Sequence, residues 1–171
     1  MGDPGDDDLR AAELNVAEAL GDLPLDFQAL TVVSNIFRTA TAARSHLERT
    51  VLAKHRLSWS AFVSLFVLRV WGDLELRLLA HEVGVTPGTL SGVIDTLERR
   101  AFVKRVAHPT DGRRVIIRST PAGVTAVESV IVAFNQEESF ITKELSATDR
   151  GELARLLRRV LRTLDGADSP G

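Results

Sequence analysis

The sequence predicts a mainly α-helical fold that carries one two-stranded β-hairpin. Apolar residues recur at helical spacing over most of the 171 residues, and glycine and proline divide the chain into helix-length segments. The pattern changes to that of strands only between residues 102 and 117. Because 44% of the residues are hydrophobic and 26% are charged, the composition excludes a wholly disordered chain and favours one domain with appendages.

The N-terminal segment, residues 1–25, is predicted to be an acidic tail that contains a short helix. Its first seven residues have the composition of a disordered tail, and a helical pattern follows from Asp8 to Leu20. From Asp26 the apolar positions repeat at helical spacing through Val51. A helix of that length in a small domain is typical of an element that packs against a second chain.

Two helices are predicted in the middle of the chain. The first can be capped by the hydroxyl of Ser58 or of Ser60, and it ends at Gly72. The second covers residues 74–83 and is followed by Gly84, which tolerates the left-handed conformation common at helix ends.

The next helix is marked by Thr86 and Pro87, a hydroxyl cap followed by a proline. Ala80 and Gly84 lie four residues apart, so a small residue and a flexible one stand where two helices must turn tightly against each other. Five apolar residues fall where the two helices would lock together: Leu79, Val83, Val85, Leu90 and Val93. The pattern indicates a helix-turn-helix, with an ordinary helical hairpin as the alternative.

A basic hairpin follows this pair of helices. Two β-type runs, residues 102–106 and 115–117, flank the turn residues 108–112. A helix of about twenty residues then begins at Thr120, and a last helix runs from Ser146 through Leu164. Two helices with a tight turn followed by a basic hairpin have the order of a winged helix-turn-helix.

Positive charge is concentrated in this hairpin. Residues 99–118 hold seven basic side chains and one acidic side chain, a net charge of +6, whereas the whole chain has a net charge of −2. A local basic segment on a mildly acidic protein favours contact with a polyanion at one place. Charge alone leaves a solvated basic surface as the alternative.

The stretch from residue 57 to 123 resembles the MarR (multiple antibiotic resistance regulator) family of bacterial transcription factors. The matching segments are LSWSAF at 57–62, LAHEVGV at 79–85, LERRAFV at 97–103, DGRR at 111–114 and STPAG at 119–123. The flanking helices extend the resemblance to residues 26–165. The resemblance implies a homodimer that binds a pseudo-palindromic operator on double-stranded DNA, most often as a repressor. It also implies a small aromatic or phenolic effector that releases the DNA.

The family's wing motif, Asp-x-Arg, falls on Asp111 and Arg113. It implies that Arg113 enters the minor groove and that Asp111 orients it. The residues predicted to contact DNA lie in the second helix of the helix-turn-helix and in the wing: Thr86, Pro87, Gly88, Thr89, Ser91, Gly92, Asp95, Arg99, Asp111, Arg113 and Arg114.

Two positions depart from the family pattern. The family often has Ser or Thr followed by a base-reading Arg in the recognition helix, whereas this chain has Ser91 and Gly92. Ala101 stands where the family prefers glycine before the wing. Operator specificity is therefore expected to depend on side chains other than an arginine at position 92.

The predicted organisation has four parts. Residues 57–119 form the winged helix-turn-helix DNA-binding domain. Residues 26–56 and 120–165 form a helical dimerisation region, between the acidic tail of residues 1–25 and a flexible tail of residues 166–171.

The aromatic residues of the helix that ends at Gly72 are candidates for an effector site. The resemblance places the family's ligand cavity where this helix meets the long first helix and the DNA-binding lobe. The candidate ligand-binding residues are His46, Trp59, Phe62 and Phe66. Packing in the hydrophobic core is the alternative for the aromatic side chains.

The sequence contains no cysteine, no His-x-x-x-His spacing, no phosphate-binding loop and no nucleophile motif. We therefore expect no metal, no cofactor and no enzymatic activity. The acidic start and the lack of a long apolar stretch favour a cytoplasmic protein without membrane association. A dimeric module that binds a small molecule or a protein, without sequence-specific DNA binding, is the alternative function.

Overall fold

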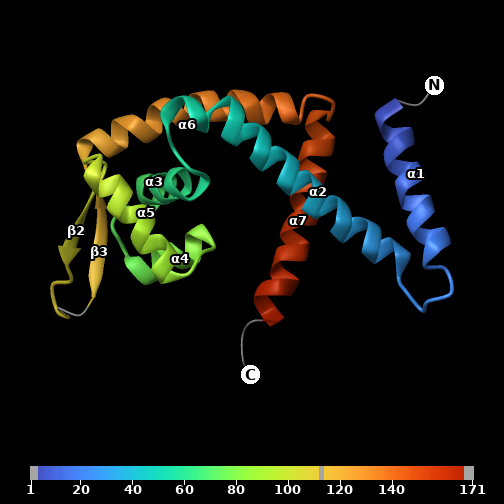
Figure 1. Cartoon of the computed structure of the whole chain (residues 1–171), viewed down its shortest axis with the longest axis horizontal. Coiled ribbons are helices and arrows are strands. Elements are labelled where there is room, and N and C mark those ends of the chain that lie inside the picture. The colour runs from blue at the N-terminus through green and yellow to red at the C-terminus, as the bar shows by residue number, and fades with distance from the viewer. Residues whose placement is uncertain (1–3, 112–113, 168–171) are drawn as a thin grey trace. The chain divides into compact units, whose positions relative to one another are not determined.

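The computed structural model describes residues 4–111 and 114–167, which form seven α-helices, one 3-10 helix and a three-stranded sheet (Figure 1). The elements in chain order are α1 (Pro4–Ala19), α2 (Phe27–Thr50), η1 (Leu52–His55), α3 (Trp59–Trp71), β1 (Leu74–Glu75), α4 (Leu76–Val83), α5 (Pro87–Arg99), β2 (Val103–Ala107), β3 (Val115–Ser119), α6 (Pro121–Ile141) and α7 (Ala147–Ala167). The chain divides into two compact units, residues 1–46 and 47–171. The predicted mainly helical fold is confirmed.

The first unit is built from α1 and most of α2. The side-chain amide of Asn35 donates a hydrogen bond of 2.8 Å to the Glu13 carboxylate and ties the two helices together. The backbone of α1 is helical from Pro4, so the expectation of a disordered stretch through residue 7 is wrong for residues 4–7. The fixed φ of proline suits the first position of a helix, which accounts for the earlier start.

The core of the second unit lies where α3, α4, α5 and α6 pack together with the sheet. Each of these elements contributes at least one side chain without exposed surface, among them Leu65, Leu79, Leu90, Val130 and Ile117. Leu79 and Leu90 are two of the apolar residues that the sequence placed between the paired helices. Their complete burial confirms that α4 and α5 are held by a shared apolar contact.

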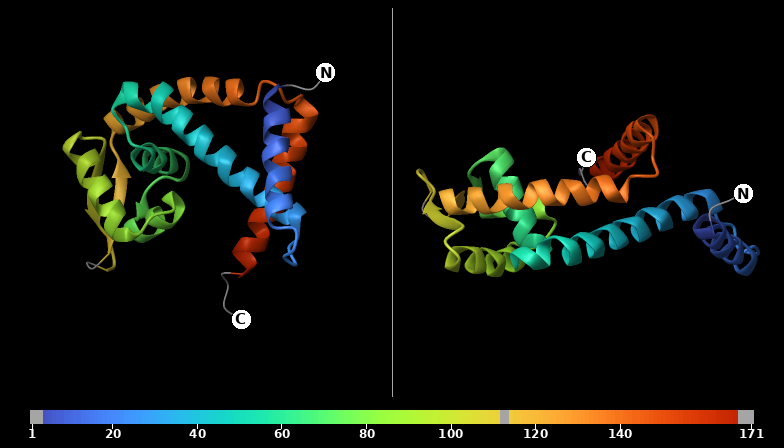
Figure 2. Two further views of the ribbon diagram at one scale, coloured as in Figure 1. Left: turned by 45° about the vertical axis from the view of Figure 1, so that its right-hand side comes forward. Right: turned by 90° about the horizontal axis from the view of Figure 1, so that it is seen from above.

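The sheet has the strand order β1–β3–β2, and both strand pairs are antiparallel. The predicted hairpin is confirmed, with Val103 opposite Ser119 at its base. Residues 74 and 75 were expected to begin a helix, but they form β1, and α4 begins at Leu76. Figure 1 and the left-hand view of Figure 2 show the β2–β3 hairpin beside α5, with the end of β2 and the start of β3 pointing away from α6.

The helices are capped by residues that the sequence indicates as candidate caps. The hydroxyls of Ser58, Thr86 and Thr120 each accept a hydrogen bond of 3.1–3.2 Å from an amide in the first turn of the following helix. Gly84 ends α4 with a φ of 73°, the left-handed conformation that glycine adopts without strain. These caps fix where α3, α4, α5 and α6 begin or end.

The last helix, α7, is amphipathic and exposed. Ser146 and Asp149 form a reciprocal capping box at its start. Six apolar side chains of α7 are 37–57% exposed: Leu153, Leu156, Leu157, Val160, Leu161 and Leu164. Along the described part of the chain, no helix is long and apolar enough to cross a membrane.

Candidate nucleic-acid interface

Helix α5 carries an apolar face inside the second unit and a polar face in solvent. Leu90, Ile94 and Leu97 have no exposed surface. Most of the predicted DNA-contacting residues lie on the opposite face, where Gly88, Thr89, Gly92, Asp95 and Arg99 are exposed and Ser91 is half-buried. Short polar side chains on an exposed helix face are of the type that reads base edges in the major groove.

The start of α5 is fixed by Thr86 and Pro87. Thr86 Oγ1 accepts a hydrogen bond of 3.2 Å from the Thr89 amide and lies 2.9 Å from the Thr89 hydroxyl. Pro87 is the first residue of the helix. These residues orient a helix N-terminus, the end that favours an anion such as a phosphate.

Gly92 leaves the middle of the exposed face bare. A Cβ atom built at Gly92 would meet nothing within 4 Å. A cavity of about 430 Å³ lies beside it, between α5 and the residues at the start of α3, and is lined by Arg56, Ser58, Thr89 and Thr96 among others. The shape of the helix therefore accommodates a larger residue at position 92.

Arg99 lies along the helix surface. Its Nη2 donates a hydrogen bond of 3.0 Å to the Thr96 hydroxyl, and its Nε donates one of 3.3 Å to the carbonyl of Asp95. Both contacts hold the guanidinium near the C-terminal end of the polar face. A guanidinium has five N–H donors, so these two bonds leave capacity for a phosphate or a base.

A second arginine, Arg105 of β2, joins the strand to α5. Its Nη2 lies 2.6 Å from Asp95 Oδ1, and its Nη1 lies 2.5 Å from Glu98 Oε2. The Arg105 amide also donates a hydrogen bond of 3.0 Å to Glu98 Oε1. Partial burial disfavours the charge, but the hydrogen bonds that the guanidinium donates to Asp95 and Glu98 outweigh it and raise the pKa of Arg105 above its ordinary value.

This cluster was not predicted from the sequence, where Arg105 counted only as part of the basic segment and Glu98 had no assigned role. One signal was available, because Ser91, Asp95 and Glu98 recur at intervals of four and three residues and so form one stripe along the helix. The partner of that stripe depends on how β2 packs on α5, which local sequence does not specify.

The wing is anchored to β1 by Glu75. Arg114 Nε lies 3.0 Å from one carboxylate oxygen of Glu75, and His108 Nε2 lies 3.7 Å from the other. The Arg114 amide donates a hydrogen bond of 3.0 Å to the Asp111 carbonyl, an i to i+3 bond typical of a β-turn. Arg113, the predicted minor-groove residue, lies outside the described residues.

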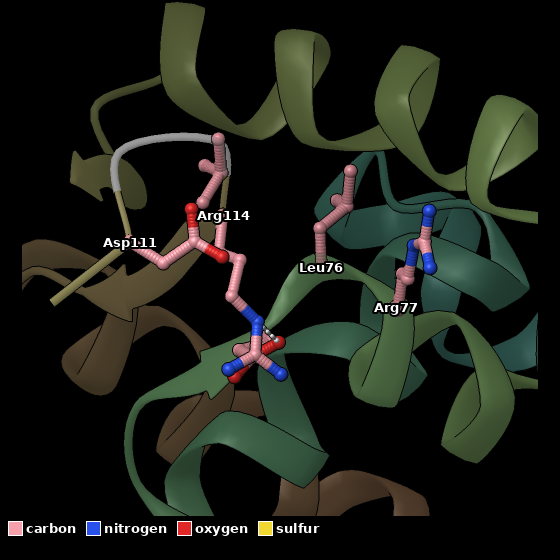
Figure 3. Close-up of a pocket in the computed structure, with 6 residues that line it drawn as sticks. Leu76, Arg77, Asp111 and Arg114 are labelled. Atoms are coloured by element: carbon pink, nitrogen blue, oxygen red, sulfur yellow. Dashed lines mark ion pairs between the residues drawn. The ribbon is translucent and has the colours of Figure 1, made fainter. Parts of the chain in front are cut away.

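A cavity of about 340 Å³ lies between the wing and the start of α4. Figure 3 shows Asp111 and Arg114 on one side of it and Leu76 and Arg77 on the other. The Arg114 side chain extends to the Glu75 carboxylate, and the dashed line in Figure 3 marks this ion pair. Arg114, a predicted wing residue, is therefore held by Glu75, while its side chain remains half exposed to solvent.

The four candidate effector residues have different environments. Phe62 is a core residue whose ring stacks on Phe134 at a centroid distance of 4.4 Å. Trp59 also contacts Phe134, at 6.1 Å, and Phe66 is 41% exposed beside Phe62. His46 is the last residue of the first unit, whereas the three aromatic residues belong to the second.

No group of three His, Asp or Glu side chains with metal-binding geometry occurs among the described residues. The ion pairs of this surface instead join carboxylates to guanidinium groups. Such pairs hold backbone elements together and carry no metal chemistry of their own.

Comparison with known proteins connects this geometry to one family. A family model described as "MarR family" matches residues 57–115. YwaE of Bacillus subtilis, named as an uncharacterized HTH-type transcriptional regulator, is 33% identical over 155 residues, which cover 89% of this chain and 91% of YwaE.

Two solved structures are also similar. BpsR of Bordetella bronchiseptica, whose DNA binding is regulated by 6-hydroxynicotinic acid, is 25% identical with a TM-score of 0.69, over 75% of this chain and 97% of BpsR. A MarR variant from E. coli in complex with operator DNA is 22% identical with a TM-score of 0.71, over 81% of this chain and 99% of that one. At that identity the second similarity concerns the fold alone.

Proposed function

The chain belongs to the MarR family of transcriptional regulators, and from this premise we propose that it is a repressor that binds a pseudo-palindromic operator as a homodimer. The observation that carries the proposal is the exposed polar face of α5 beside a wing in a segment of net charge +6. As a transcriptional regulator, rather than an enzyme, the protein would act where the chromosome lies, in the cytoplasm.

The exposed apolar face of α7 supports the homodimer. In a single chain, six leucine and valine side chains of α7 remain 37–57% exposed, and Phe37 of α2 is 68% exposed. Apolar surface of this kind along one helix, as on α7, marks an interaction site. A second copy of the chain is the partner that the family resemblance implies, and we assign residues 26–56 and 120–165 to this dimerisation region.

Sedimentation velocity tests the dimer. We expect a species of twice the 18.7 kDa chain mass at micromolar concentration. Leu157→Asp should convert it to a monomer, because a carboxylate would be buried without a partner. Leu78→Asp is the matched control, since Leu78 of α4 is 55% exposed and lies outside the dimerisation region. A stable monomer for the unaltered chain would exclude the homodimer.

For DNA, we propose that α5 enters the major groove and that the wing contacts the backbone or the minor groove. The contacting residues are Thr86, Pro87, Gly88, Thr89, Ser91, Gly92, Asp95 and Arg99 from the helix, and Asp111, Arg113 and Arg114 from the wing. Residues on the helix would supply sequence discrimination, and those on the wing would supply affinity that depends little on sequence.

Fluorescence anisotropy with a selected operator and with mixed DNA, at four salt concentrations, tests this division. Arg113→Ala should weaken binding to both DNAs and make log K fall less steeply with log salt, by about 1.8 for the two wings of a dimer. Arg69→Ala is the control, because Arg69 of α3 is paired with Glu128 of α6 and belongs to neither α5 nor the wing. An unchanged affinity and salt slope for Arg113→Ala would remove the wing from the DNA interface.

We further propose a small aromatic or phenolic effector that weakens DNA binding. The regulation of the relative BpsR by 6-hydroxynicotinic acid supports this class of ligand. An effector acts only by binding the DNA-incompetent state more tightly than the competent state. A panel of aromatic carboxylates and phenols should therefore contain compounds that raise the melting temperature and lower DNA affinity, and Phe66→Ala should reduce both effects.

A dimer that binds a small molecule or a protein, without specific DNA binding, is the second candidate. It is favoured by Gly92 in place of a base-reading arginine and by the net charge of −2. A gel shift on mixed genomic DNA at low and high salt distinguishes the two. Retardation that persists for some fragments at high salt supports the repressor, whereas no retardation at either salt supports the second candidate.

A further inference from the structure

A stripe of three polar residues on α5 faces strand β2. Ser91, Asp95 and Glu98 occupy successive turns of the helix, and one guanidinium, that of Arg105, reaches all three. It lies 2.6 Å from Asp95 Oδ1 and 2.5 Å from Glu98 Oε2. It also donates longer hydrogen bonds, of 3.3 and 3.4 Å, to the carbonyl and hydroxyl of Ser91.

The two carboxylates of the stripe are bound differently. Both oxygens of Glu98 are engaged, one by the Arg105 guanidinium and the other by the Arg105 backbone amide at 3.0 Å. Asp95 meets Arg105 through Oδ1 alone, and its side chain is 58% exposed. A carboxylate accepts about four hydrogen bonds, so Asp95 keeps accepting capacity on its exposed side. Glu98 therefore anchors the strand to the helix, whereas Asp95 is oriented and still able to bind a partner.

A carboxylate on a DNA-facing helix is electrostatically unfavourable unless its charge is offset. Phosphates on both sides of the major groove repel it, and the repulsion is strongest when the side chain rotates toward them. Arg105 offsets the charge of Asp95 and fixes the direction of its carboxylate. In the major groove, an acidic side chain accepts a hydrogen bond from the exocyclic amino group of cytosine.

We propose that Asp95 reads a cytosine amino group in each operator half-site and that Arg105 is the positioning residue for this contact. The proposal rests on the DNA-binding function proposed above and adds the base that the helix discriminates. It also identifies a specificity-determining side chain in a recognition helix that has glycine at position 92. Arg105 acts through Asp95 and Glu98, without touching the base.

Selection of bound sequences from a random duplex pool tests the proposal, with the full-length chain and its variants. The unaltered protein should select one C·G pair per half-site with a preference of about five- to tenfold over the other pairs. Asp95→Ala should lose the preference at that pair and keep the preferences at the remaining positions. Asp95→Asn should shift the preference toward adenine, because an amide pairs with the adenine N6 and N7 atoms.

The positioning role is tested in the same selection. Arg105→Ala should flatten the preference at the same pair, and Arg105→Lys should restore part of it, since a lysine keeps the charge without the forked geometry. Arg118→Ala is the matched control, because Arg118 of the neighbouring strand β3 is paired with Asp73 at 2.6 Å. It should leave every base preference unchanged. Melting curves of all variants establish that they are folded.

Two results would overturn the proposal. If Asp95→Ala selects the same sites with equal preferences, Asp95 does not read a base, although the DNA-binding function stands. If Arg105→Ala alters all positions equally while Asp95→Ala alters one, Arg105 serves the fold or the backbone contact rather than this reading. Failure of the unaltered protein to enrich any sequence would instead remove the DNA-binding function itself.

Discussion

Gly123 lies at a contact that a single methyl group would disrupt. It is the third residue of α6, and its amide donates a hydrogen bond of 3.1 Å to Thr120 Oγ1. A Cβ atom built at Gly123 would lie 2.0 Å from the carbonyl oxygen of Phe102 and 2.8 Å from the carbonyl carbon. Ordinary carbon–oxygen contacts are no shorter than about 3.3 Å, so Gly123→Ala requires a displacement of more than about 1 Å.

The cost follows from the atoms that must move. The Phe102 carbonyl accepts a hydrogen bond of 3.0 Å from the Thr120 amide, whereas the Thr120 hydroxyl donates its shorter bond, of 2.6 Å, to the Ala101 carbonyl. The bond to the Phe102 carbonyl contributes about 1 kcal/mol, and overpacking a well-packed site costs about 1–3 kcal/mol more. We therefore expect Gly123→Ala to lower the free energy of unfolding by about 2–4 kcal/mol.

Thermal unfolding monitored by circular dichroism measures this effect at one fixed protein concentration. A loss of that size lowers the melting temperature by about 4–16 °C for a chain of this length. Gly92→Ala is the matched control, because a Cβ there meets nothing within 4 Å and an alanine inside a helix stabilises by about 0.5–1 kcal/mol. A Gly123→Ala protein that melts within about 2 °C of the unaltered one would refute the reasoning.

Three further substitutions have defined outcomes. Ala101 has a φ of 56°, so Ala101→Gly should relieve backbone strain and raise the urea-unfolding free energy by about 0.5–1 kcal/mol. Phe134→Ala removes the ring that stacks on Phe62 at 4.4 Å, and it should lower that free energy by about 3–5 kcal/mol. Gly92→Arg places a guanidinium in open space on the polar face of α5, and it should tighten binding to mixed DNA and steepen the salt dependence in anisotropy measurements.

Local signals in the sequence predicted the helices because each helix has its own boundary chemistry. Thr86 with Pro87 and Thr120 with Pro121 mark helix starts that the structure confirms. Gly84 marks a helix end, because glycine adopts the left-handed conformation at a helix C-terminus without strain. The family's preference for glycine at position 101 also has a physical basis, since Ala101 occupies the left-handed region.

Features that depend on pairing between distant segments could not be predicted in this way. Strand β1 is two residues long and exists because Leu74 and Glu75 pair with β3, more than forty residues later in the chain. A two-residue strand has no periodicity of its own to detect. The same limit applies to Arg105, whose contacts with α5 require the hairpin to fold back on the helix.

Ion pairs with nearby carboxylates offset part of the positive charge of the basic segment. Residues 99–118 have a net charge of +6, yet carboxylates outside the segment already pair with three of its arginines: Arg105 with Asp95 and Glu98, Arg114 with Glu75, and Arg118 with Asp73. Exposed pairs of this kind contribute little to stability, typically below about 1 kcal/mol. Their effect is on geometry, because each joins the hairpin to a segment that precedes it in the chain. The field that a polyanion meets is therefore weaker than the count of basic residues suggests, and the direction of each guanidinium is set before DNA arrives.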